Sequence, residues 1–178
     1  MGRIQPEEFW RWAYSDFLSN ALRGVLAEYI VAKAVNATGR TRKEWDAYDL
    51  ITPDRLRIEV KSSAYLQTWS QKQPSKIIFD ISKKRAWYAE TNTMSKHPQR
   101  TADVYVFCVF AEDRKKLADP LDLKQWFFLV SSAEFIDRTF KDQKKVSLST
   151  LERHGLSRLS FEDMQGHLIA RKIIEKGR

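Results

Sequence analysis

The sequence predicts a single α/β domain built around a mixed β-sheet. The chain of 178 residues has the usual length of one domain, and its 43% hydrophobic content is enough for a sizeable core. The predicted order of elements is helix, three strands, helix, two strands and further helices. Strands therefore outnumber the crossover helices that a β-α-β repeat requires, which favours a mixed sheet over a doubly wound parallel one.

Helix is predicted first, over residues 6–36. Pro6 suits the first position of a helix, and the glutamates that follow it suit the positive end of the helix dipole. Ser19 or Asn20 can cap a second helix after a break, because both are favoured N-cap residues. We therefore expect two helices in this region, ending before Gly39.

From Trp45 onward the pattern changes to β-structure. A hairpin is predicted from residues 45–51 and 55–67 with a turn at 52–54, and a third short strand from 76–82. Residues 83–94 are predicted to be helical. The apolar segments 102–110 and 125–131 are typical of strands that are buried on both faces.

The final part of the chain is predicted to be a helical extension. Ser149 and Gly155 predict the start and the end of a short helix, and the pair Ser160 and Asp163 predicts the start of another. Because no linker separates these helices from the rest, we expect a single domain over residues 1–178. Its core is expected over about 20–135 and its extension over about 136–178.

Composition restricts the partners of the protein. There are 31 Lys and Arg against 23 Asp and Glu, a formal net charge of +8, which favours nucleic acid or an anionic membrane surface. Apolar segments are too short to span a bilayer and the N-terminus has no apolar signal-peptide core, so no membrane partner and a cytoplasmic location are expected. The lone Cys108 excludes an intramolecular disulfide, and the absence of a glycine-rich phosphate loop argues against a nucleotide cofactor.

Residues 55–67 carry the first candidate for chemistry. If side chains alternate along this strand, Glu59 and Lys61 share one face, together with Gln67. A solvated charged face is the ordinary interpretation of such a pattern. Asp46 and Asp49 precede the turn, however, and the hairpin can bring Asp49 alongside Glu59. Two carboxylates that close repel each other unless a cation lies between them, and Mg²⁺ takes such ligands.

Glu28 is the second candidate. The predicted helix around it, residues 21–35, is apolar nearly all round, and Glu28 lies among small apolar residues. A buried carboxylate needs a partner or a metal. Arg23 and Lys33 are each five residues away, which is a poor spacing for a pair within one helix.

Together, the segments RGVLAEY (23–29), DL (49–50) and IEVKSS (58–63) resemble the PD-(D/E)XK phosphodiesterase superfamily, which includes restriction endonucleases. The resemblance covers about residues 20–110 and implies a restriction-endonuclease-like α-β-β-β-α-β core, in which helices flank a central mixed sheet. The literal PD pair is absent, because Tyr48 precedes Asp49. Asp46 therefore stays an alternative to Asp49.

This resemblance implies a metal-dependent nuclease that hydrolyses DNA phosphodiester bonds, with an endonuclease favoured. Mg²⁺ is the implied cofactor, with Mn²⁺ as an alternative. A homodimer is one arrangement that the resemblance allows. The implied metal ligands are Asp49, Glu59 and the backbone carbonyl of Val60, with Glu28 completing the acidic cluster. Lys61 would orient or help deprotonate the attacking water, and Gln67 is a further catalytic candidate.

Basic residues are the candidates for contacts with DNA. One set precedes the acidic hairpin and the other precedes Trp87, whose ring could stack on a base: Arg40, Arg42 and Lys43, and Lys83, Lys84 and Arg85.

Two other functions stay open. A non-catalytic nucleic-acid-binding module on the same fold would use the basic surface alone. An assembly protein would use the aromatic N-terminus, with Trp10 and Trp12, as a docking surface.

Overall fold

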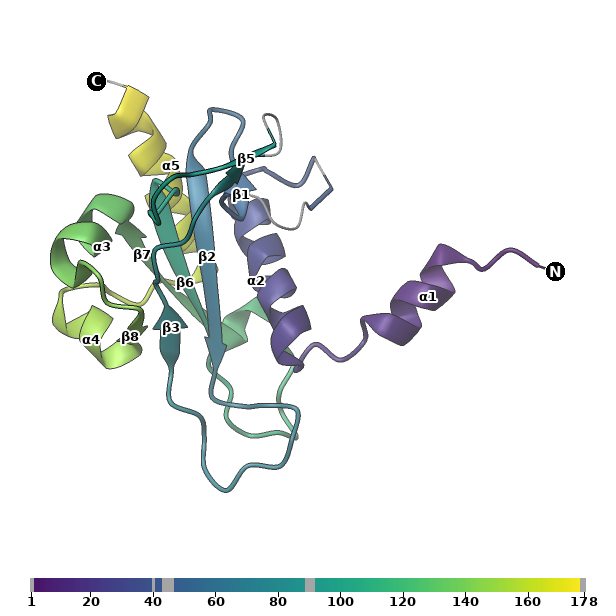
Figure 1. Cartoon of the computed structure of the whole chain (residues 1–178). Coiled ribbons are helices and arrows are strands. Elements are labelled where there is room, and N and C mark those ends of the chain that lie inside the picture. Colours follow the sequence, from purple (N-terminus) through teal and green to yellow (C-terminus); the bar gives the residue numbers. More distant parts are fainter. Residues whose placement is uncertain (1, 40, 43–46, 89–91, 177–178) are drawn as a thin grey trace.

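The structure is a computed structural model of the chain, and it describes residues 2–39, 41–42, 47–88 and 92–176. Its centre is a four-stranded sheet in the order β1-β2-β6-β7 (Figure 1). β1 (Leu50–Ile51) is antiparallel to β2 (Arg57–Ala64), and β2 is parallel to β6 (Val104–Phe110). β7 (Trp126–Ser132) is antiparallel to β6. The sheet is thus mixed, and the predicted α/β class is confirmed.

One face of the sheet is covered by α2 (Asn20–Ala34) and α5 (Phe161–Lys176). Side chains of α2, such as Ala27 and Ile30, pack against Ile58 and Val60 of β2 in one hydrophobic core. The Ser19 hydroxyl accepts a hydrogen bond from the backbone of Leu22 and so caps α2, which confirms the predicted start of the second helix. The packing of α2 against β2 places this helix beside the hairpin that was predicted to carry the site.

The opposite face is covered by four shorter elements. β3 (Ile78–Asp80) and β8 (Lys145–Ser147) pair as a separate two-stranded sheet, flanked by α3 (Ala133–Phe140) and α4 (Leu148–Arg153). Their apolar side chains form a second core with Tyr105, Phe107 and Leu129 of the main sheet. β6 therefore lies between two cores, and all of its residues are buried, as its apolar sequence predicted.

The helix predicted over residues 83–94 is wrong for the described part of that segment. It contains an antiparallel pair of short strands, β4 (Trp87–Tyr88) and β5 (Thr93–Met94). Aromatic residues and threonine favour extended backbone, and Asn92 adopts the left-handed turn conformation, with φ of 52°. The predicted α-β-β-β-α-β order therefore lacks its second helix, and its third strand pairs with β8 outside the central sheet.

The extension after β7 is only partly as predicted. A short 3-10 helix, η1 (Leu123–Gln125), precedes β7, and α3 and β8 were not predicted. Ser147 caps α4 in place of the predicted Ser149, because its hydroxyl accepts from the backbone of Thr150. The predicted pair at the start of α5 is present, with the Asp163 backbone donating to the Ser160 hydroxyl. No helix in the described ranges has the length and apolar character to cross a membrane.

α1 (Pro6–Ala13) stands away from the rest of the molecule (Figure 1). None of its residues is buried, and Phe9, Trp10, Trp12 and nearby Tyr14 are exposed. Its sequence forms a helix because Pro6 occupies the first turn and two glutamates follow it. The aromatic N-terminus is thus available on the surface, as the docking interpretation requires.

Candidate active site

The site is built just before the start of β1, beside the middle of β2. The backbone N–H of Asp49 donates to the carbonyl of Ile58 at 3.1 Å, and the Asp49 carboxylate accepts from the backbone N–H of Val60 at 2.7 Å. The carboxylate thus takes the place that a backbone carbonyl would hold in the ladder. This bond holds Asp49 against the edge of β2, beside Glu59.

Glu59 and Lys61 project from the face of β2 opposite to Ile58 and Val60, as strand alternation predicted. The Lys61 ammonium donates to Oε1 of Glu59 at 2.5 Å. Their side chains are only 16% and 15% exposed, so the pair is largely withdrawn from solvent. The ammonium is therefore held beside the carboxylates, where low solvent access strengthens its field.

Burial and charge change the protonation of this group. Burial first, and then the charges of Glu59 and Glu28, raise the pKa of Asp49 to about 6, although the Val60 N–H and the charge of Lys61 oppose the change. Burial lowers the pKa of Lys61, but the adjacent carboxylates, Glu59 first, outweigh it and leave this pKa raised. A carboxylate whose negative charge is this unfavourable is a good ligand for a cation.

The donor set suits a hard divalent ion. In an extended strand the N–H and C=O of one residue point to the same edge, so the Val60 carbonyl faces the side on which Asp49 lies. Two carboxylates and one carbonyl are oxygen ligands of the kind that Mg²⁺ takes together with water. Among the described residues no three His, Cys, Asp or Glu side chains form a metal-holding group.

Glu28 lies near these residues but is bonded elsewhere. Its carboxylate, 14% exposed, forms a two-point ion pair with Arg42, with Nε to Oε2 at 2.5 Å and Nη2 to Oε1 at 3.0 Å. Glu28 is close enough to raise the pKa of Asp49. The structure thus places Glu28 at the border of the acidic group and gives it a partner from outside its helix, not Arg23 or Lys33.

Gln67 is placed apart from the other predicted residues. Its side-chain oxygen accepts from Arg23 at 3.4 Å, and its nitrogen donates to the Ala64 carbonyl and the Ser75 hydroxyl. Arg23 is 1% exposed and also donates to the carbonyls of Leu18 and Leu66. These contacts make Gln67 part of a buried brace between α2 and the end of β2.

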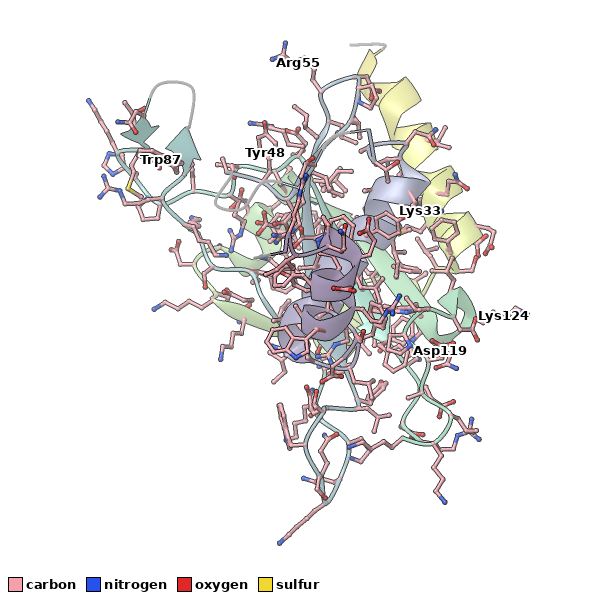
Figure 2. The ribbon with its side chains drawn as sticks, turned by 90° about the vertical axis from the view of Figure 1, so that its right-hand side faces the viewer. Lys33, Tyr48, Arg55, Trp87, Asp119 and Lys124 are labelled. Carbon is pink, nitrogen blue, oxygen red and sulfur yellow. The ribbon has the colours of Figure 1, made fainter. Side chains whose placement is uncertain are left out.

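A cavity of about 610 Å³ opens in front of the carboxylates. Asp49 and Glu59 line it, and so do residues on and before the β4–β5 hairpin, Lys84, Arg85 and Trp87. Figure 2 shows the hairpin with Trp87 standing out to one side of the molecule. A strand of nucleic acid in this cavity would meet an acidic pair, basic groups and an aromatic ring together.

The basic residues predicted to contact DNA fall into three groups. Arg40 and Lys43, like the alternative ligand Asp46, lie outside the described residues. Arg42 is paired with Glu28, and Lys83 donates to Asp142 at 2.9 Å. Two residues, Lys84 and Arg85, line the cavity.

The cavity residues that the sequence analysis did not name include Arg100 and Tyr105. Tyr105 lies opposite Glu59 in the parallel β2–β6 register, is 3% exposed, and has its pKa raised by burial and by Glu59. The apolar sequence of β6 identified a buried strand, but only the register with β2, 46 positions earlier, places this ring at the site.

A carboxylate pair with an adjacent ammonium, facing a cavity with basic groups in a basic protein, defines a hydrolase that acts on phosphodiesters. Residues 11–150 match the family described as Bacteriophage T4 endonuclease IV. The chain therefore belongs to the bacteriophage T4 endonuclease IV family and is a DNA-cleaving nuclease.

Comparison with curated proteins finds no match. Among solved structures, the chain is similar to a bacterial homing endonuclease, I-Ssp6803I, at 19% sequence identity and a TM-score of 0.47. The match covers 90% of this chain and 99% of that one. At this distance nothing about the site follows from it.

Proposed function

We propose that this nuclease is a metal-dependent endonuclease of the PD-(D/E)XK type, with a restriction-endonuclease-like core. The observation that carries the proposal is the group formed by Asp49, Glu59 and Lys61, in which the Val60 N–H fixes one carboxylate and the ammonium is bonded to the other. Asp49, Glu59 and the Val60 carbonyl would hold Mg²⁺. When bound, Mg²⁺ neutralises charge on a phosphate oxygen and lowers the pKa of a water.

Lys61 has two tasks in this proposal. Its ammonium, held beside Glu59, donates a hydrogen bond that orients the attacking water, and it stabilises the negative charge that develops on the phosphate. Burial of the group excludes bulk water, which makes each of these interactions stronger than it would be in solution. In this proposal Glu28 does not bind the metal directly, and its negative charge raises the pKa of Asp49.

The test compares the wild type with Glu59→Gln, Lys61→Met and a control variant, Glu134→Gln. Glu134 is exposed on α3 and lines no part of the cavity. Each protein is incubated with plasmid DNA and with a labelled single strand, in Mg²⁺, Mn²⁺ or EDTA. Wild type and Glu134→Gln are expected to cut in the presence of metal. Both site variants are expected to lose about 100-fold or more in rate.

Binding of the labelled DNA in EDTA separates catalysis from recognition. Lys61→Met is expected to bind as the wild type does, because its ammonium acts in the reaction. Circular dichroism confirms that each variant is folded. Equal cleavage by the wild type and both site variants would contradict the proposal. Salt-sensitive binding with no metal-dependent cleavage would instead identify a non-catalytic DNA-binding module on this fold.

A further inference from the structure

Of the described residues, three cationic ones line the cavity in front of the carboxylates, and they differ in how far their charges are already engaged. The side chain of Arg100 is 0% exposed, and most of its N–H groups already donate hydrogen bonds within the protein. It donates to the carbonyls of Ile81, Lys141 and Gln143 at 2.9, 2.9 and 3.3 Å, and it forms an ion pair with Asp137. This guanidinium joins β3 to the end of α3 and has little capacity left for a ligand.

Arg85 is partly engaged. Its Nε donates to the carbonyl of Ser95 at 2.9 Å, and the backbone N–H of the next residue, Ala86, donates to the hydroxyl of Ser95. These two bonds tie the segment before β4 to the segment after β5. Arg85 therefore contributes to the shape of the hairpin as well as to its charge.

Lys84 is in a different position. Its backbone is fixed by two hydrogen bonds with Gln99, with N to O distances of 3.1 and 2.9 Å. Across the described ranges of the chain, its ammonium makes no hydrogen bond or ion pair. The neighbouring Lys83, in contrast, donates to Asp142 and does not line the cavity. Lys83 is therefore engaged in a surface ion pair, whereas the ammonium of Lys84 can bind a ligand in the cavity.

Lys84 also belongs to the electrostatic environment of Lys61. Burial raises the pKa of Asp80, but bonds from Ser82 and the charges of Lys84 and Lys61 outweigh this and leave that pKa lowered. Both ammonium groups therefore act on one carboxylate, and Lys84 lines the same cavity as Asp49 and Glu59. A phosphate in the cavity would meet both the carboxylate group and this second ammonium.

We infer that Lys84 is a phosphate-binding residue of the active site: its ammonium binds a phosphate of the DNA strand that occupies the cavity, which Asp49 and Glu59 also line. This inference rests on the proposed function for the identity of the strand. It assigns to Lys84 alone a role that the sequence could only assign to the cluster Lys83, Lys84 and Arg85. Lys83 contributes to the net charge of the protein but touches no DNA in the cavity.

The experiment compares Lys84→Met, Lys84→Arg and the matched control Lys83→Met. The two Met variants remove one charge each from adjacent positions, so the net charge changes equally. Binding of a fluorescein-labelled oligonucleotide, single-stranded and as a duplex, is measured in EDTA over a series of NaCl concentrations. For Lys84→Met the slope of log K against log salt is expected to fall by about 0.7–0.9, the value for one lost phosphate contact.

Lys83→Met is expected to keep the wild-type slope, and Lys84→Arg is expected to restore most of it. With Mg²⁺, Lys84→Met is expected to raise KM about 10-fold with a smaller change in kcat. Equal slopes for Lys84→Met and Lys83→Met would overturn the inference. A wild type that binds but fails to cleave would overturn the proposed function only, because the salt series tests Lys84 without metal.

Discussion

At the scale of single residues, Asp49 shows how the fold turns a common turn residue into a functional group. Asp is frequent beside turns and alone predicts nothing. Here its carboxylate replaces a backbone acceptor for Val60 and lies beside Glu59 in a setting where its ionisation is unfavourable. The protein therefore holds a negative charge at a cost in stability, which a bound cation would remove.

This cost has a measurable pH dependence. The pKa of Asp49 is raised from 3.8 to about 6, so the wild type loses stability as the pH rises from 3.8 to about 6, and the cost is absent below this range and complete above it. In EDTA at pH 8, Asp49→Asn is expected to unfold with a free energy roughly 1–3 kcal/mol higher than the wild type. At pH 4 the two should be equal. Urea denaturation at both pH values measures the difference.

The exposed Asp113 offers a matched control, since Asp113→Asn is expected to match the wild type at both pH values. Adding Mg²⁺ at pH 8 should then stabilise the wild type but not Asp49→Asn, because a ligand stabilises only the form that binds it. A lower stability of Asp49→Asn at pH 8 would show that the Val60 bond needs the charged carboxylate.

Gln67 provides the second prediction at this scale. Because it accepts from the buried Arg23, whose Nε already lacks a partner in the described residues, Gln67→Ala should lower the free energy of unfolding. The expected loss is about 1–3 kcal/mol, as for a buried bond to a charged group. Its kcat, measured below the unfolding transition, should stay within about threefold of the wild type. A 100-fold loss of kcat at unchanged stability would make Gln67 the catalytic residue that its position on the strand predicted.

Among the secondary-structure elements, the β4–β5 hairpin contributes Trp87 to the lining of the cavity. The ring is half-buried and lines the same cavity as Asp49. Trp87→Ala is expected to weaken binding of a labelled DNA strand about 10-fold, because stacking of one base on an aromatic ring contributes about 1–3 kcal/mol. Trp12→Ala, at a site 85% exposed on α1, should leave binding unchanged. Fluorescence anisotropy titrations compare the two, and equal effects would exclude Trp87 from the DNA site.

For α1, in contrast to the hairpin, we expect that removal changes neither stability nor cleavage. None of its residues is buried, so deletion of residues 2–13 should shift the melting temperature by no more than about 2 °C, less than 1 kcal/mol causes in a domain of this size. Cleavage should also be retained. Light scattering of the full chain and the deletion variant shows whether the exposed aromatic side chains hold copies together. Loss of a dimer on deletion would support the homodimer and assign it to α1.

At the scale of the whole molecule, β6 makes one cooperative unit of the two cores. Cys108, fully buried at its centre, has a pKa raised by burial, so its thiol has little reactivity in the folded protein. Modification by a thiol reagent should therefore require global unfolding, and its rate in increasing urea should follow the unfolding equilibrium. Fast labelling without denaturant would show that β6 becomes exposed by a local opening.

Local interactions explain the parts of the fold that could be predicted from the sequence. The break before α2, the hairpin at residues 52–54 and the capping of α5 each depend on residues within a few positions of one another. The segment 83–94 was misassigned because its charged residues are compatible with a helix, whereas its aromatic residues and Asn92 form a hairpin. Propensity alone is too weak to decide between the two.

For the site, strand alternation was enough to place Glu59 with Lys61, and the short turn was enough to bring Asp49 beside them. The partners of Glu28 and Gln67 could not be predicted in this way. The pair of Glu28 with Arg42 and the bond of Gln67 to Arg23 depend on how α2 packs against the loop after it and against the end of β2. Packing of this kind leaves no periodic signal.

Composition and short-range spacing are enough to specify the basic charge of the protein, the mixed α/β class and the three residues at the hairpin. Two features of the site depend on the folded arrangement instead: which lysine of the pair Lys83 and Lys84 lines the cavity, and which ring of β6 lies opposite Glu59. These depend on the register of strands that are far apart in the chain. The register is set by the packing of both cores together, and a short segment of sequence does not contain this information.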